Sequence, residues 1–332
     1  MSVSRGRVFT GALSNAGVYT LPNFTYSASV SLDSKFIYCA SNGKIQILNR
    51  DISTGALTTG VVVSGASSEW FCTSPDNNHL YNCLSSERQI RAYSKNVSTG
   101  GLTFIGDYST GSTHSTQLVE MSPDGSSVLT VNYAAAVLYV FQRNATTGVL
   151  TLASSISTVW DCRRNLFSPD GLFVYSYGYS SSMKIFQRNL STGQLTFLAN
   201  SSGAGDQKNA SMTSDGLYIY VAGSGGIACY SRNPTTGLLT DIGSPTNPSL
   251  TYLTPGGNCL SSDNKTFYVS YINHGYIGRF DRNMSTGVLT YNSLFYVGQS
   301  YYPYTVSMPL DDSNLYCVIS SGTSGIITCT RT

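Results

Sequence analysis

The chain has 332 residues, of which 41% are hydrophobic and 11% are charged, and its formal net charge is +2 at pH 7. Helical bundles depend on Glu, Lys, Ala and Leu, and this chain, with three Glu and 24 Tyr, does not have their composition. The 12% of aromatic residues argues against disorder, and the near-neutral charge without a basic stripe argues against nucleic acid as a partner. No apolar run approaches the roughly 18 residues of a membrane helix, so we expect no membrane insertion.

The first 20 residues, MSVSRGRVFTGALSNAGVYT, have no basic head followed by an apolar stretch, so we expect no secretory signal. The eight Cys show neither a CxxC pair nor a zinc spacing. Because several lie in apolar runs, such as FIYCA around Cys39 and LYCVI around Cys317, we interpret them as buried free thiols. A disulfide framework is the less favoured alternative. We expect neither a metal site nor a cofactor.

Two phrases recur along the chain. The first occurs six times: RDISTGALT (50–58), KNVSTGGLT (95–103), RNATTGVLT (143–151), RNLSTGQLT (188–196), RNPTTGLLT (232–240) and RNMSTGVLT (282–290). The second contains an Asp followed by an apolar run, and its Asp falls at positions 33, 76, 124, 170, 215, 263 and 311. The spacing of 43 to 48 residues fits one propeller blade and is too long for a leucine-rich or ankyrin repeat.

Each unit predicts four antiparallel strands. A short inner strand, such as residues 118–122, precedes a Ser-Pro-Asp-Gly turn, in which Pro presets φ and Asp bonds to its own backbone. The second strand follows, as in 172–178, and the third ends in an Arg-Asn pair, as in 183–189. The Ser-Thr-Gly turn then leads into an outer, fourth strand. Radial repetition of these sheets predicts an all-β fold, a β-propeller of four-stranded antiparallel blades.

The seven Asp turns predict seven blades in a single propeller domain over residues 1–332. The last unit ends after its third strand, IITCTRT (326–332), and therefore lacks a fourth. We expect residues 1–24, in particular RVFTGALSNAGVYTL (7–21), to supply the missing strand or strands and to close the ring by pairing the two ends of the chain. An eighth, split blade is the less favoured alternative, because residues 7–21 are long enough for two strands.

Strand direction sorts the connections onto two faces. The Ser-Pro-Asp and Ser-Thr-Gly turns share one face, which we call the turn face, and the variable connections share the opposite loop face. Because the repeated turns are structural, we expect function on the loop face, around the start of each inner strand. Aromatic rings beside polar groups there favour carbohydrate binding, although Tyr occurs in most loops. The candidate ligand-binding residues are Glu69, Trp70, Tyr133, Trp160, Asp161, Tyr179, Asp206, Lys208, His274 and Tyr302.

The paired phrases SPDGLFVYSYG and MKIFQRNLSTGQLT (168–196), with their repeats, resemble the lactonase-type seven-bladed propellers, the family of bacterial 6-phosphogluconolactonase and fungal carboxymuconate-lactonising enzyme. The resemblance implies His, Arg and Glu side chains around the channel at the start of the inner strands. His114 in GSTHSTQLVEMSPDG matches one such position, and Arg163 or Arg164 in DCRRNLFSPDG matches another. Asn165 stands where the family pattern leads one to expect His, and Glu120 lies in the same predicted strand as His114.

Two functions of different classes follow, and whether the protein is an enzyme stays open at this point. The composition favours a non-catalytic propeller displayed on a surface, such as a viral or phage virion structural, decoration or glycan receptor-binding protein. Its partners would be a glycan or neighbouring coat or tail subunits, and it would reach the particle surface after cytoplasmic assembly, or otherwise stay cytoplasmic. The alternative is a metal-independent lactonase hydrolysing or isomerising a sugar-type lactone, with His114 as general base and Arg163 or Arg164 stabilising the oxyanion.

Overall fold

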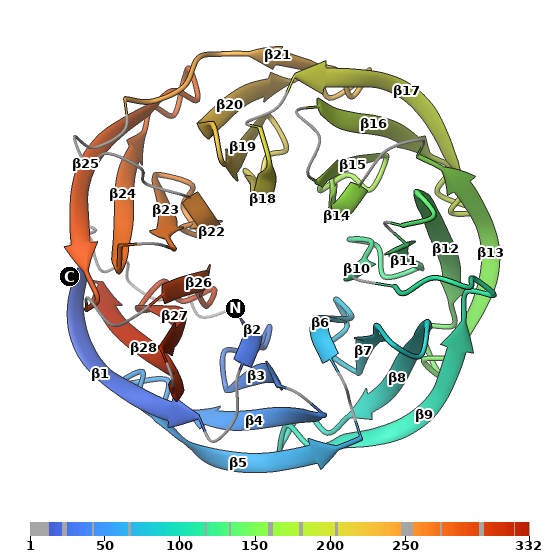
Figure 1. Ribbon diagram of the computed structural model, residues 1–332, viewed down its shortest axis with the longest axis horizontal. Coiled ribbons are helices and arrows are strands. Elements are labelled where there is room, and N and C mark those ends of the chain that lie inside the picture. The colour runs from blue at the N-terminus through green and yellow to red at the C-terminus, as the bar shows by residue number, and fades with distance from the viewer. Residues whose placement is uncertain are drawn as a thin grey trace, which may run out of the picture.

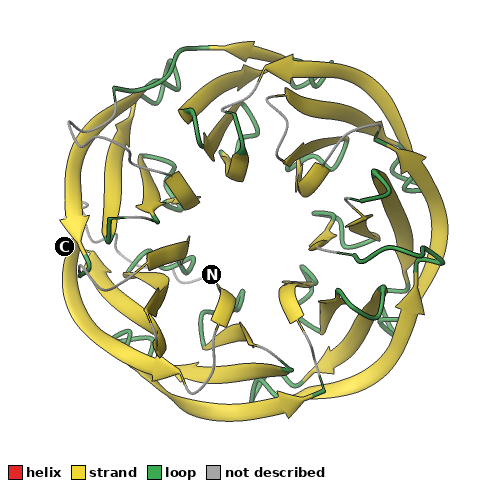
Figure 2. Cartoon of the chain, in the orientation of Figure 1, coloured by secondary structure: helices red, strands yellow, loops and turns green. Residues whose placement is uncertain are grey.

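The described residues form 28 β-strands, which make seven four-stranded sheets arranged radially around one axis (Figure 1). The computed structural model describes residues 13–21, 25–41, 43–65, 68–116, 118–132, 134–158, 162–178, 182–202, 205–246, 255–272, 274–298, 302–321 and 323–331. Within these ranges only strands, turns and loops occur (Figure 2), and no helix there is long and apolar enough to cross a membrane. The fold is the predicted seven-bladed β-propeller.

Blades 1 to 7 begin with the inner strands, which surround the axis (Figure 1). These are β2 (Thr25–Val30), β6 (Ser68–Thr73), β10 (Leu118–Met121), β14 (Cys162–Phe167), β18 (Gln207–Met212), β22 (Pro255–Leu260) and β26 (Tyr302–Ser307). The second strands are β3 (Phe36–Ser41), β7 (His79–Leu84), β11 (Ser127–Asn132), β15 (Phe173–Gly178), β19 (Tyr218–Gly223), β23 (Thr266–Tyr271) and β27 (Asn314–Ser321). The third strands are β4 (Lys44–Arg50), β8 (Gln89–Lys95), β12 (Val137–Arg143), β16 (Ser182–Arg188), β20 (Gly226–Arg232), β24 (Tyr276–Arg282) and β28 (Thr323–Arg331). The outer strands are β5 (Leu57–Ser64), β9 (Leu102–Ser109), β13 (Leu150–Ser157), β17 (Leu195–Ser202), β21 (Leu239–Asp241), β25 (Leu289–Tyr296) and β1 (Leu13–Leu21).

The ring closes between the two ends of the chain. β1 is the outer strand of blade 7, and it pairs antiparallel with β28 from Leu13 opposite Arg331 to Leu21 opposite Ser324. Residues 13–21 form this one strand, so the blade is completed and no split eighth blade is built from them. The predicted closure by N- and C-terminal strands is confirmed.

Both repeated phrases fold into hydrogen-bonded turns. In the first, the side-chain oxygen of Asn144 accepts the backbone N–H groups of Thr146 and Thr147, each at 3.0 Å, and Gly148 takes the positive φ of 74° that closes the turn. In the second, the Ser122 hydroxyl donates to Asp124 at 2.5 Å. These Ser, Thr and Asn side chains are therefore occupied in holding the hairpins.

Side chains of the two repeated phrases also join neighbouring blades. Arg232, at the end of β20, donates to the Tyr175 hydroxyl at 2.9 Å and to the Asp170 carboxylate at 2.7 Å, both in the preceding blade. The Tyr175 hydroxyl in turn donates to the Gly237 carbonyl at 2.8 Å. The same three-part contact recurs between Arg143, Tyr81 and Asp76, and between Arg50, Tyr316 and Asp311. The Arg of the first phrase and the Asp and Tyr of the second thus form the hydrogen bonds that connect one blade to the next.

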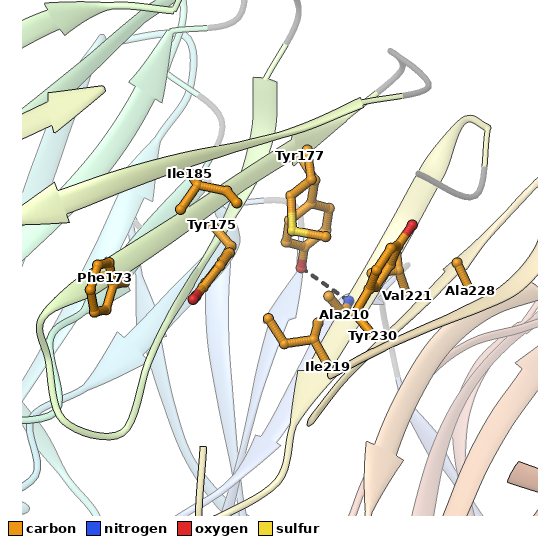
Figure 3. Close-up of a cluster of buried hydrophobic side chains, with 10 residues drawn as sticks. Phe173, Tyr175, Tyr177, Ile185, Ala210, Ile219, Val221, Ala228 and Tyr230 are labelled. Carbon is orange, nitrogen blue, oxygen red and sulfur yellow. Dashed lines mark hydrogen bonds between the residues drawn. The ribbon is translucent and has the colours of Figure 1, made fainter. Parts of the chain in front are cut away.

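Apolar side chains fill the space between blades. The cluster between blades 4 and 5 includes Phe173 and Ile185 on one side and Ile219 and Val221 on the other (Figure 3). Tyr177 belongs to this cluster, and its hydroxyl accepts the Ala210 backbone N–H at 3.1 Å (Figure 3). The second strands β3, β7, β11, β15 and β23 are buried at every residue, because blades cover both of their faces.

All eight Cys lie in described parts of the chain and are free thiols, six of them buried. Burial raises the pKa of the Cys229 thiol to about 12, so this side chain behaves as an apolar core residue. The interpretation of the Cys as buried thiols agrees with this arrangement.

The connections separate onto two faces as strand direction requires. On the loop face, the outer-to-inner crossovers bond to the loops between second and third strands. Examples are Gly65 N–H to the Gly43 carbonyl at 3.0 Å and Val297 N–H to the Gly275 carbonyl at 2.8 Å. On the turn face, the contacts of Arg with Tyr and Asp, which we call the Arg clamps, bring the Ser-Pro-Asp turns beside the Ser-Thr-Gly turns.

Candidate functional site

A cavity of about 420 Å³ lies against the inner strands of blades 1, 2 and 3. We call it the inner-strand cavity. Among the described residues, its lining is mostly apolar or hydroxyl-bearing and includes one carboxylate, that of Glu120. These lining residues are Ser27, Ala28, Ser29, Leu32, Trp70, Phe71, Cys72, Thr73, Pro75, Glu120, Met121, Ser122 and Pro123. A concave space of this size, with few polar groups, fits a small organic ligand.

The cavity lies toward the turn face, because Leu32, Pro75 and Pro123 belong to the Ser-Pro-Asp turns or their equivalent. This position differs from the expectation of a site at the loop-face rim. The physical reason is that the turns only bound the cavity, while its chemical groups come from the non-repeated middle of the inner strands. Repetition on the turn face therefore does not prevent a varied site from forming just inside it.

Trp70 and Arg164 meet beside this cavity. The guanidinium carbon of Arg164 lies 3.8 Å from the centre of the Trp70 ring, which is a close cation–π contact. Trp70 comes from β6 and Arg164 from β14, so the contact reaches past blade 3, which lies between them (Figure 1). Trp70 also packs against the apolar cluster that contains Leu118 of β10.

Irregular pairing of the inner strands surrounds both residues. The register between β6 and β7 shifts between Ser68 and Phe71, and that between β14 and β15 shifts between Cys162 and Arg164. A bulge places an extra residue in one strand and changes the direction of nearby side chains. Trp70 and Arg164 each lie six residues before the Asp of their turn, at Asp76 and Asp170, so equivalent bulges bring equivalent positions toward the axis.

Glu120 of β10 is a half-buried carboxylate in the cavity wall. Burial raises its pKa from the usual carboxyl range to about 7, and the nearby positive charge of Arg164 opposes this rise. A carboxyl group with a pKa near neutrality exchanges protons readily at physiological pH, as a general acid or base requires. Glu120, Arg164 and Trp70 therefore form one cluster of side chains, contributed by three successive inner strands.

His114 lies elsewhere. It is exposed, at a bend four residues before β10, and its Nδ1 is 3.1 Å from the Thr113 hydroxyl. Its backbone carbonyl accepts the side-chain N–H of Asn132 at 2.5 Å. The imidazole is not among the groups that line the inner-strand cavity.

The remaining candidates are dispersed or beyond the described residues. Lys208 and Asp206 form an ion pair with each other at 2.6 Å, and His274 lies in the loop that precedes β24. Arg163 is half-buried beside Arg164 in β14. Four predicted binding residues, Tyr133, Trp160, Asp161 and Tyr179, lie outside the described residues, and so do the side chains of Glu69 in β6 and Tyr302 in β26.

Glu120 is the residue whose role the sequence did not reveal. The repeat pattern places it in the same inner strand that follows His114 and indicates no chemical role for it, although it is one of three Glu in the chain. Its position four residues before the turn Asp, where the other inner strands carry Ser, Cys or Leu, is the signal that could have identified it.

Comparison with known proteins places this geometry in context. The model of the family described as "Lactonase, 7-bladed beta-propeller" matches residues 34–160, a stretch that contains Trp70 and Glu120. This match spans less than half of the chain, and its description agrees with the seven-bladed propeller of the structure. No curated protein matches the sequence.

Solved structures of differently named proteins have a similar overall fold. A putative 6-phosphogluconolactonase from Bacteroides fragilis is similar with a TM-score of 0.69 and 17% identity, over 81% of this chain and 83% of that one. The periplasmic gluconolactonase PpgL of Pseudomonas aeruginosa gives a TM-score of 0.70 at 17% identity, over 82% and 85%. Hydrazine synthase of Kuenenia stuttgartiensis gives 0.70 at 14% identity, over 98% and 99%.

At such identities the likeness establishes the fold alone. Within that limit, the family match favours the lactonase alternative over the surface-displayed virion or glycan-binding role, which none of these similarities supports.

Proposed function

We propose that this protein is a lactonase-type hydrolase that opens a sugar-type lactone in the inner-strand cavity. The observation that carries the proposal is the half-buried carboxyl of Glu120, with a pKa of about 7, in the wall of a cavity of about 420 Å³. The family match over residues 34–160 supports the same reaction class.

Glu120 serves as the general base. Its carboxylate form predominates above about pH 7, and it is then basic enough to take a proton from water. An ordinary exposed Glu, with a pKa near 4.3, is ionised at neutral pH but is a far weaker base. Burial against the cavity wall therefore gives Glu120 a basicity matched to neutral pH.

Arg164 stabilises the negative charge that develops on the lactone carbonyl oxygen. A guanidinium stays protonated and carries several N–H donors, so it can stack on an aromatic ring and still donate hydrogen bonds. Contact with the Trp70 ring at 3.8 Å restricts the position of this group before substrate arrives. Less reorganisation is then needed as the transition state forms.

The steps balance without a metal or redox partner. Glu120 accepts a proton from water as the water oxygen bonds to the acyl carbon of the lactone, and the carbonyl oxygen becomes an oxyanion beside Arg164. Collapse of this intermediate breaks the bond between the acyl carbon and the ring oxygen. Protonated Glu120 returns its proton to that oxygen, giving the open hydroxy acid.

Replacement of the base tests the proposal. We expect Glu120→Gln to lower kcat for hydrolysis of glucono-1,5-lactone by roughly 100-fold or more, because general-base catalysis contributes on the order of 10² to 10⁴. The wild-type rate, after subtraction of spontaneous hydrolysis, should rise with pH and reach half of its maximum near pH 7, following the Glu120 pKa of about 7. Lactone consumption is measured by NMR or in a pH-stat.

Glu87→Gln is the matched control, because Glu87 is an exposed residue of the connection between β7 and β8. It makes the same chemical change away from the cavity and should leave kcat within twofold. A Glu120→Gln protein with unchanged unfolding temperature and an unchanged rate would contradict the proposal.

A further inference from the structure

Exposed apolar side chains are concentrated on the turn face. Among the described residues, eighteen large hydrophobic side chains are exposed, and ten of them lie in the connections between strands on this face. Their exposed fractions range from 39% at Leu217 to 67% at Leu310. The other eight lie in outer strands, around the circumference of the ring. Within the described residues, the turn face is therefore the apolar face of the molecule.

One position of the Ser-Thr-Gly turn is apolar and exposed in all six copies. It is the residue after the capping Asn or Asp, and it is occupied by Ile52, Val97, Ala145, Leu190, Pro234 and Met284. The turn itself does not need an apolar residue there. Around Leu190, for example, the Asn189 side-chain oxygen already accepts the N–H groups of Ser191 at 2.9 Å and of Thr192 at 3.0 Å. An apolar residue that the fold does not need indicates a contact outside the chain.

The turns are joined to one another around the axis. Between blades 5 and 6, the Asn264 side chain donates to the Ser214 hydroxyl at 2.6 Å. Between blades 6 and 7, the Ser262 hydroxyl donates to the Asp312 carboxylate at 2.6 Å. The Ser-Thr-Gly turns lie farther from the axis, because they join third and outer strands, and the Arg clamps hold them to the inner turns. Since the blades surround one axis (Figure 1), the apolar residues of these turns form a ring, and an exposed apolar surface of this extent is typical of a binding face.

The charges of this face cancel. The second phrase is counted here from two residues before its Asp to five residues after it. The two phrases, with Arg331 at the corresponding end of β28, then contain nine Asp and nine Lys or Arg, so their net charge is zero. Five of these Arg are ion-paired with Asp, as Arg232 is with Asp170 at 2.7 Å. Two such faces would not repel each other, and a face without net positive charge is not attracted to the anionic lipids of a membrane.

The size of the apolar surface matches what a dimer needs. A fully exposed aliphatic side chain presents about 100 Å² of apolar surface, so ten side chains that are roughly half exposed present on the order of 500 Å². A standard protein interface buries about 800 Å² on each partner, of which about 60% is apolar, again on the order of 500 Å². The turn face can therefore supply the apolar part of one interface.

We propose that the turn face binds the turn face of a second copy of this chain. A ring of apolar residues requires a partner with a matching ring. A second copy presents one when a two-fold axis perpendicular to the propeller axis relates the two copies. Such an isologous contact is closed, so it forms a dimer and no longer assembly.

This dimer would cover one end of the inner-strand cavity. Leu32, Pro75 and Pro123 line the cavity and belong to the turn face, so the second copy lies over that end. We therefore expect the dimer to hydrolyse lactone more slowly than the monomer. This consequence rests on the function proposed above, whereas the dimer itself does not.

Sedimentation equilibrium of the full chain tests the dimer. Between about 1 and 100 µM, we expect the mass of the wild type to rise from 35.6 kDa toward twice that value. The double variant Leu190→Lys with Met284→Lys places charges on the turn face and should raise the dissociation constant at least about tenfold, because like charges would face each other. The matched control, Leu152→Lys with Phe197→Lys, alters outer-strand residues of similar exposure and should dimerise as the wild type does.

Three outcomes would overturn the proposal. The first is a wild type that stays monomeric over this range, and the second is an equal loss of dimer in the two double variants. The third is a monomeric wild type that floats with phosphatidylcholine and phosphatidylserine vesicles, which would assign the face to a membrane.

Specific activity at several protein concentrations separates the dimer from the proposed reaction. It should fall as the fraction of dimer rises in the wild type and stay constant in Leu190→Lys with Met284→Lys. If the dimer forms through the turn face but no lactone is opened at any concentration, the hydrolase proposal fails and the dimer stands. If lactone is opened equally fast by monomer and dimer, the covering of the cavity is wrong.

Discussion

Arg164 of blade 4 reaches past the inner strand of blade 3 to lie 3.8 Å from the ring centre of Trp70 in blade 2. The contact brings together side chains from blades that are not neighbours in the ring. It also holds a permanent positive charge close to Glu120, whose pKa it lowers against the effect of burial. The protonation state of the carboxyl therefore depends on a residue in another blade.

Removal of that charge should change the titration of Glu120. In Arg164→Gln we expect the Glu120 pKa to rise above its value of about 7, because burial then acts without an opposing positive charge. Carbon-13 NMR of glutamate-labelled protein can measure this directly, since the chain has only three Glu. Arg163→Gln, one residue away, should leave the titration unchanged, and an identical rise in both variants would refute the assignment to Arg164.

His79 should make stability depend on pH. Burial, and then the positive charge of Arg143, lower its pKa below 6.5, while Asp76 acts in the opposite direction. Its Nδ1 lies 2.7 Å from Nη2 of Arg143, so the neutral ring accepts that hydrogen bond. As pH falls below about 6.5 the unfolded chain binds a proton that the folded protein does not, and the free energy of unfolding decreases.

Replacement of the imidazole tests this dependence. His79→Phe, which uses the residue found at the equivalent Phe36 and Phe173, should lose less stability than the wild type between pH 7.5 and pH 5.5 in urea denaturation. The Asp76 carboxyl has a pKa lowered to about 2 and stays ionised across this range in both proteins. Parallel losses in the two proteins would show that His79 does not carry the effect.

The tyrosine hydroxyls between blades should contribute measurably to stability. Tyr175→Phe leaves both Nε of Arg232 and the Gly237 carbonyl without their buried partner, which should reduce the free energy of unfolding by about 2 to 3 kcal/mol. Tyr296→Phe removes a hydroxyl from a side chain that is 45% exposed, and its effect should be within about 0.5 kcal/mol.

Blade 3 shows why this cost is expected. Leu129 stands where other blades have the clamp Tyr, and the Nε of Arg188 is left there without a hydrogen-bond partner in the described structure. Equal unfolding midpoints for Tyr175→Phe and Tyr296→Phe would mean that the interblade hydroxyl is dispensable.

One glycine is required by its surroundings as well as by its backbone. Gly237 and Gly43 have nearly equal positive φ values of 73° and 74°, yet a Cβ on Gly237 would collide with the Phe173 ring, whereas a Cβ on Gly43 meets nothing within 4 Å. Both Ala variants should lose about 1 kcal/mol from backbone strain. Gly237→Ala should lose a further 1 to 3 kcal/mol, roughly, from overpacking, and thermal unfolding that ranks the two equally would disprove the steric explanation.

The sequence predicted the blades well because each of them repeats the same local chemistry. The turn phrases contain Pro, Asp and Gly where the backbone requires them, so their spacing defined seven sheets and the closing strand. The residues of the Arg clamp also belong to these phrases, since the Arg ends the third strand and the Tyr lies in the second strand. The Arg and the Tyr of one clamp, however, come from two different blades. A one-dimensional pattern does not show that Arg232 and Tyr175, 57 residues apart, are hydrogen-bonded.

The site was less predictable for a related reason. The positions of Trp70 and Arg164 before the turns were enough to predict them as candidate site residues. Their contact with each other depends on the curvature of the ring, which the sequence does not show. The family resemblance predicts His114 as the general base, but its exposed imidazole is not part of the cavity lining. The basicity of Glu120 comes from burial and from Arg164, and neither effect is visible in the order of residues.

The pairing of β1 with β28 has a consequence for synthesis of the protein. The ladder that completes blade 7 joins Leu13 to Arg331, two residues that are 318 positions apart in the sequence. The other six blades are each built from four consecutive strands, so each can assemble as soon as its own strands have been made, whereas blade 7 stays incomplete until β28 is available to pair with β1. Until then β1 lacks its strand partner, and an unpaired strand edge is prone to pair with another chain.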